Sequence, residues 1–218
     1  MAYPILQLDI LGGHYDPVTE TIVSDGPTFT LVAILTPKAN VPLSTYMNDT
    51  FYISAALSPK TGPTDSSLGS FSWEGTNYLV TEDMTYGSPP LETFIAATDP
   101  GDLAGHGVYP TFYTEFGFQF DTNQRTTSYN SQDDPGGLAP TSATTGISYF
   151  QTFNITSSLI GDNTLHFDLY NSYVAGCKKS GTCSLDEDVA LFAPFSHDAQ
   201  SSQSVPEPGA LMALFAGL

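Results

Sequence analysis

Short runs of alternating apolar and polar residues recur along most of the chain, separated by Gly, Pro, Asp and Asn. Alternation with a period of two is typical of half-buried β-strands, and residues 5–10 and 111–120 follow it clearly. Residues 29–36 are almost continuously apolar, as expected of a central strand. Further strands are expected at 20–23, 50–57, 69–73, 76–81, 147–155, 164–170 and 189–192, with a hairpin turn at Glu74-Gly75.

These runs predict an all-β fold. About ten strands with turn signals between them, and no long run of helical spacing before the C-terminal tail, indicate a two-layer antiparallel β-sandwich of the jelly-roll type. No internal repeat and no long linker divides the body. We therefore expect residues 1–203 to form one sandwich domain and residues 204–218 to form a separate tail.

Charge narrows the range of partners. Lys and Arg total 5 against 23 Asp and Glu, which gives a formal net charge of −18. Phosphate contacts dominate nucleic-acid affinity, so this charge argues against binding to DNA or RNA. It argues equally against docking of the body on anionic lipid headgroups. Two interpretations stay open: like charge that keeps the protein soluble in an extracellular medium, or a surface that binds divalent cations.

Two cysteines, Cys177 and Cys183, flank a short Lys- and Gly-containing segment. This spacing suits a disulfide that closes a surface loop, and the loop-entropy model gives such a ring roughly 2 kcal/mol. A disulfide indicates an oxidising compartment. A metal site at these cysteines would need further ligands, and His197 is the nearest histidine.

Motifs of known enzyme classes do not occur in the sequence. It holds no G-x-S-x-G elbow, H-E-x-x-H zinc helix, Walker loop or C-x-x-C pair, so we expect a protein that is not an enzyme. His166 alternates with Leu165 and Phe167, which places it on the opposite, polar face of its strand. His106, His197 and the adjacent Asp198 are expected in loops, where they are candidates for a shared ligand site.

Calcium is the cation that the acidic turns fit best, because hard cations take carboxylate and carbonyl oxygens from turn-rich loops. Each candidate also reads as a solvated turn, since Asp is favoured in turns for its local hydrogen bonds. The aromatic residues Trp73 and Tyr109 fit either stacking on sugar rings or packing in the core. The calcium candidates are three groups of carboxylates: Asp9 with Asp16, Asp133 with Asp134, and Asp186 with Asp188.

The tail combines the motif Val205-Pro206-Glu207-Pro208 with an apolar run from Gly209 to Leu218. It resembles the PEP-CTERM sorting signal of Gram-negative bacteria. The resemblance implies entry through a Sec leader and recognition of the motif by an exosortase, a membrane protease. The proline rings fix φ and hold the segment extended for a protease groove.

The printed tail is shorter than the complete signal. Ten residues span about 15 Å as a helix, against a hydrocarbon core of about 30 Å. The expectation is therefore that a leader and the second half of the anchor are missing from this chain. Contact with a membrane is expected only through a complete tail.

The body is similar to a group of surface proteins called choice-of-anchor N. The similarity rests on residues 6–16, on Gly105-His-Gly-Val-Tyr-Pro110 leading into the strand at 111–120, and on Ser196-His-Asp198. Members share an ectodomain and differ in their anchors, and the group implies no particular activity. The matching segments contain His106, His197 and Asp198, which strengthens the case for these residues as ligands.

The leading hypothesis is an exported, non-catalytic β-sandwich protein that is processed through its tail and delivered to the cell surface or the exopolysaccharide matrix. One alternative is a calcium-dependent carbohydrate-binding module. Another is a hydrolase on a jelly-roll scaffold, which requires carboxylates with perturbed pKa values gathered in a cleft.

Overall fold

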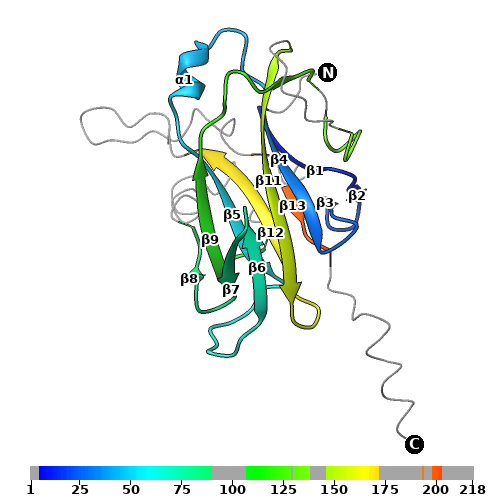
Figure 1. Cartoon of the computed structure of the whole chain (residues 1–218), viewed down its shortest axis with the longest axis vertical. Coiled ribbons are helices and arrows are strands. Elements are labelled where there is room, and N and C mark those ends of the chain that lie inside the picture. The colour runs from blue at the N-terminus through cyan, green and yellow to red at the C-terminus, as the bar shows by residue number, and fades with distance from the viewer. Residues whose placement is uncertain are drawn as a thin grey trace, which may run out of the picture.

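Two β-sheets pack face to face in the computed structural model, which describes residues 5–89, 107–128, 130–137, 146–171, 193 and 198–202 (Figure 1). The six-stranded sheet has the order β1-β4-β11-β6-β7, with β10 paired to β11. Its strands are β1 (Leu6–Ile10), β4 (Thr28–Leu35), β6 (Gly69–Trp73), β7 (Thr76–Leu79), β10 (Arg125–Thr126) and β11 (Ser148–Leu159).

The seven-stranded sheet has the order β2-β3-β13-β12-β5-β9-β8. Its strands are β2 (His14–Asp16), β3 (Thr21–Val23), β5 (Phe51–Ser58), β8 (Thr85–Gly87), β9 (Thr111–Phe118), β12 (Thr164–Asn171) and β13 (Asp198–Gln200). The pairing of β13 with β3 is parallel, and the other described pairings are antiparallel. The prediction of an antiparallel β-sandwich is therefore confirmed.

The core lies between the sheets and is built from alternate residues of facing strands. Leu6, Leu8 and Ile10 of β1 are fully buried, as are Leu165 and Phe167 of β12. The inward face of each strand therefore carries the apolar half of the alternation that the sequence displays. All eight residues of β12 are buried, so the outward half of this strand is covered as well.

Trp73 belongs to this core. Its side chain is 7% exposed and stacks on Phe116, with ring centroids 4.0 Å apart and planes 4° from parallel. Phe153 of β11 packs against the same indole, with ring centroids 4.8 Å apart. Trp73 therefore takes the packing role, and the alternative of a sugar-stacking surface at this residue is excluded by its burial.

The predicted hairpin between β6 and β7 is confirmed. Glu74 and Gly75 take φ values of 50° and 80°, and Trp73 pairs with Thr76 across the turn. Positive φ at both central residues defines the turn whose twist matches the flanking strands, and Gly adopts it at little steric cost.

Some elements differ from those expected. Strands β2, β8, β10 and β13 and the short helix α1 (Leu43–Met47) lie in segments that the alternation pattern did not mark. The strand expected at 189–192 lies outside the described residues. In the described part of the chain, no helix has the length and apolar character needed to cross a membrane.

Candidate functional site

A polar cluster lies on the side of the seven-stranded sheet that faces away from the core. In β12, Leu165 and Phe167 point into the sandwich, and His166 and Asp168 alternate with them. The prediction that His166 takes the opposite face holds, but the residue is only 5% exposed. The side chains of β12 that face away from the core are therefore buried as well, unlike those of a strand whose outer face is open to water.

Strand β13 brings a third ionisable residue to the cluster. The register pairs His166 with Gln200 and Phe167 with Ala199, which places Asp168 opposite Asp198 in the next antiparallel position. The Nε2 atom of His166 lies 3.0 Å from Asp168 Oδ1 and 3.8 Å from Asp198 Oδ2. Among the residues that the structure describes, these three form the group of His, Cys, Asp and Glu side chains whose geometry suits a metal ion.

Hydrogen bonds from neighbouring side chains hold the polar cluster in place. The Tyr109 hydroxyl donates to Asp168 Oδ2 over 2.7 Å, and the Ser54 hydroxyl lies 2.7 Å from the Tyr109 hydroxyl. On the same side of the sheet, Tyr170 donates to Glu115 Oε1 over 2.6 Å. The Tyr109 hydroxyl is therefore engaged by the cluster, while the residue as a whole is half-buried, so a sugar-stacking role for its ring stays a prediction.

Both tyrosines, Tyr109 and Tyr170, remain protonated at neutral pH. Burial, followed by the negative charge of Asp168, raises the pKa of Tyr109 well above its usual value. Burial and the hydrogen bond to Glu115 raise the pKa of Tyr170 in the same direction. Both hydroxyls therefore act as donors that fix the orientation of the neighbouring carboxylates.

Alkaline titration is expected to delay the ionisation of Tyr109 and Tyr170, and also of Tyr113, whose pKa burial raises as well. A folded-state pKa above the unfolded value contributes stability that is full below about pH 10 and is lost as pH rises further. Tyrosinate absorbance should therefore show a delayed fraction that appears together with the loss of the native circular dichroism. Simultaneous ionisation of every tyrosine in the native state would contradict this expectation.

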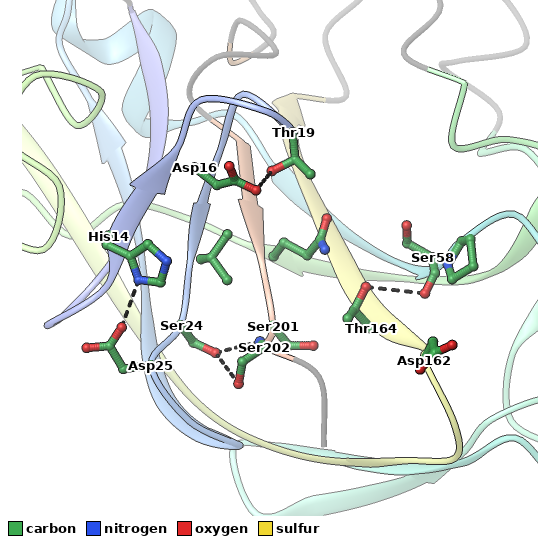
Figure 2. Close-up of a pocket in the computed structure, with 13 residues that line it drawn as sticks. His14, Asp16, Thr19, Ser24, Asp25, Ser58, Asp162, Thr164, Ser201 and Ser202 are labelled. Atoms are coloured by element: carbon green, nitrogen blue, oxygen red, sulfur yellow. Dashed lines mark hydrogen bonds and ion pairs between the residues drawn. The ribbon is translucent and has the colours of Figure 1, made fainter. Parts of the chain in front are cut away.

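An open pocket of about 720 Å³ lies at the other end of β13, beside Ser201 and Ser202 (Figure 2). His14 Nδ1 lies 2.8 Å from Asp25 Oδ1 at its rim, and these side chains are 60% and 71% exposed. Asp162 lines the pocket as well. The described residues that line it include no Phe, Tyr or Trp, so none of them offers a ring surface of the kind on which carbohydrate-binding modules stack sugars.

The carboxylates proposed for calcium lie in separate places. Asp16 accepts bonds from the Val18 amide and the Thr19 hydroxyl, and these bonds lower its pKa. Asp9 is fully buried and accepts a bond from the Gly136 amide, so it holds the loop that contains Asp133 and Asp134.

None of these four aspartates belongs to the described group of three metal-ligating side chains. The carboxylate of Asp16 accepts hydrogen bonds within its own turn, and the carboxylate of Asp9 accepts one from a packed loop. A calcium site at these places stays a prediction.

The expectation of a loop at Asp198 is wrong, because Asp198 is the first residue of strand β13 and is held there by pairing with β3. Asp198 meets His166 and Asp168, a combination that the sequence analysis did not propose. The local signal was available, because the His-Phe-Asp spacing places His166 and Asp168 on one face of a strand. The undescribed candidates are His106, His197, Cys177, Cys183, Asp186, Asp188, Val205, Pro206, Glu207 and Pro208.

The architecture is that of an antiparallel β-sandwich protein with a buried polar layer on one sheet. The sequence matches no protein-family model and no curated protein. One similar solved structure is the 35 kDa C-terminal fragment of the major pilin GBS80 of Streptococcus agalactiae, at 14% identity and a TM-score of 0.31. The match covers 93% of this chain and 57% of that one.

Another similar structure is the C-terminal domain of the antigen I/II-family protein AspA of Streptococcus pyogenes, at 10% identity and a TM-score of 0.30. That match covers 93% of this chain and 53% of the other. This chain therefore spans little more than half the length of either structure.

Proposed function

We propose that this chain is the ectodomain of an exported bacterial surface or extracellular-matrix protein, processed by an exosortase at Val205–Pro208. The observation that carries the proposal is the Val-Pro-Glu-Pro motif followed by an apolar run at the C-terminal end of the sequence. In this role the ectodomain is non-catalytic, and its partners are the processing protease and the exopolysaccharide of a Gram-negative cell surface.

The position of the last described strand supports processing at this motif. Strand β13 ends at Gln200, and the backbone amide of Ser202 donates to Ser24 Oγ over 2.8 Å. The described fold therefore ends just before the motif. Cleavage within residues 205–208 leaves every described strand in place, as release of a folded ectodomain requires.

The composition supports an extracellular location for the protein. A net charge of −18 keeps like molecules apart and hinders adsorption to anionic lipids, so the released body remains dispersed or matrix-bound. The spacing of Cys177 and Cys183 agrees with an oxidising compartment.

Processing is expected to depend on the two prolines of the motif. The test expresses the precursor, with a Sec leader and a complete anchor, in a Gram-negative host with and without an exosortase. Intact mass spectrometry should find a C-terminus within residues 205–208 only when the protease is present. Replacing Pro206 and Pro208 with alanine removes the fixed φ angles that hold the segment extended and should abolish that product.

The matched control replaces Pro63, a proline in an exposed loop of the body, with alanine. This variant should be processed like the parent. The same C-terminus in cells that lack the exosortase, or unchanged processing of the Pro206 and Pro208 variant, would refute the sorting proposal.

A further inference from the structure

His166, Asp168 and Asp198 converge on one point between strands β12 and β13. Their ligand atoms all lie within 4.8 Å of one another, and each residue is at most 5% exposed. We propose that this three-residue cluster binds one divalent first-row transition-metal ion, with Zn²⁺ as the best match. The proposal does not depend on the sorting signal.

Electrostatics favours a cation at this point. Asp168 and Asp198 occupy directly opposite positions on neighbouring strands and are 4% and 1% exposed. Like charges directly opposite in a sheet repel, and burial raises the cost of keeping both carboxylates ionised. A divalent cation between the carboxylates turns that repulsion into attraction, and no main-chain rearrangement is needed to bring the ligands together.

The ligand set selects the class of metal. Calcium and magnesium prefer oxygen ligands throughout, whereas imidazole suits zinc, copper, iron and nickel. Carboxylates accept the same metals, so one histidine with two aspartates fits Zn²⁺ better than Ca²⁺. The distances of 3.0 and 3.8 Å from His166 Nε2 to the two carboxylates bracket the ligand-to-ligand separation of about 3.3 Å that tetrahedral Zn²⁺ requires.

Tyr109 supplies the outer support that such sites use. Its hydroxyl donates to Asp168 Oδ2, and Asp168 Oδ1 is the oxygen that lies beside His166. The two oxygens of Asp168 are thus divided between an orienting hydrogen bond and the metal. Ser54 fixes Tyr109 in turn, over 2.7 Å. Partners of this kind orient metal ligands, and their loss typically weakens metal affinity by about 10–100-fold.

The test uses the untagged chain after removal of metals with a chelator. Zn²⁺ is titrated in competition with a chromophoric chelator, and bound metal is counted by mass spectrometry after dialysis. We expect a single tightly bound Zn²⁺ per chain, a rise in melting temperature, and no comparable binding of Ca²⁺. Co²⁺ should give the visible absorption bands of a low-symmetry site with a nitrogen ligand, and Zn²⁺ should displace it.

Substitutions assign the binding to these residues. His166→Gln and Asp198→Asn remove ligands and should weaken the affinity by more than the about 10–100-fold expected for Tyr109→Phe. His14→Gln is the matched control, because His14 also pairs with an aspartate but is exposed. Replacing Cys177 and Cys183 with serine tests binding by thiolates instead. Neither control should change the affinity.

Absence of Zn²⁺ and Co²⁺ binding by the folded wild-type chain would overturn the proposal. So would Zn²⁺ binding that is lost in the serine variants or in His14→Gln. If His166→Gln or Asp198→Asn fails to fold, the decision rests on Tyr109→Phe, which removes only a hydroxyl. A folded Tyr109→Phe chain with wild-type Zn²⁺ affinity and an unchanged Co²⁺ spectrum also counts against the site.

Discussion

Replacing Phe167 with alanine is expected to lower the free energy of unfolding by about 3–5 kcal/mol, the usual cost of truncating a buried phenylalanine. Phe167 is fully buried at the centre of β12. Its ring makes an edge-to-face contact with Phe29 of β4, with centroids 6.0 Å apart, so it joins the two sheets directly. Its loss leaves a cavity between the layers rather than at their rim.

Urea unfolding followed by circular dichroism measures this loss, with the slope of the transition used to confirm that the unfolded state is unchanged. Ile160→Ala is the control, because Ile160 is 56% exposed in the turn after β11. It should change stability by less than about 0.5 kcal/mol. Equal effects of the two substitutions would show that β12 does not form the centre of the core.

The strands that the sequence predicted best are those with an apolar inner face and a clear turn at each end. Residues 29–36 correspond to β4 and 164–170 to β12, and both strands hold central positions in their sheets. The hairpin at Glu74-Gly75 was equally readable, because its turn chemistry is local. Such features depend on neighbours in the sequence, and a single chain displays them directly.

The missed strands depend on partners far away in the sequence. Residues 198–200 have no alternation that marks a strand, yet β13 is held between β3 and β12. In Figure 1 the orange strand β13 lies in the same sheet as the blue strand β3, although they come from opposite ends of the chain. Three residues contribute too little intrinsic preference to be recognised, and the ladder bonds on both sides supply what the pattern lacks.

The candidate site shows the same limit. The His-Phe-Asp spacing places His166 and Asp168 on one face, and that much follows from strand geometry. The addition of Asp198 requires the register of β13, and the addition of Tyr109 requires the path of the segment before β9. Neither is encoded near β12. Sequence reasoning therefore reached Asp198 as a candidate without identifying its partners.

A chain that ends at residue 197 is expected not to form the native sandwich, whereas one that ends at residue 203 should be as stable as the whole. Strand β13 is the sole link between β2-β3 and the rest of the seven-stranded sheet in the described strand order. Its removal takes away the strand that pairs with His166 and Phe167 of β12, although the Ala193 amide still donates to the Leu169 carbonyl.

The bonds lost with this strand indicate the size of the effect. The Ser24 amide donates to the Gln200 carbonyl, and the Ser201 amide donates to the Leu165 carbonyl. The Leu165 amide donates to Ser201 Oγ, and the pairing with β3 and β12 is lost in addition. At a net value of about 1 kcal/mol for each bond, the sum is comparable to a typical folding stability of roughly 5–15 kcal/mol.

The melting temperatures and amide proton dispersion of the two truncated chains test whether strand β13 and the tail are needed for the fold. A native spectrum for the chain ending at residue 197 would mean that β13 is dispensable and that the folded body ends well before the sorting motif. Loss of stability in the chain ending at residue 203 would mean that the tail itself supports the fold. Cleavage within residues 205–208 would then release a weakened ectodomain, because the residues up to Ser202 would not suffice to hold the last strand in place.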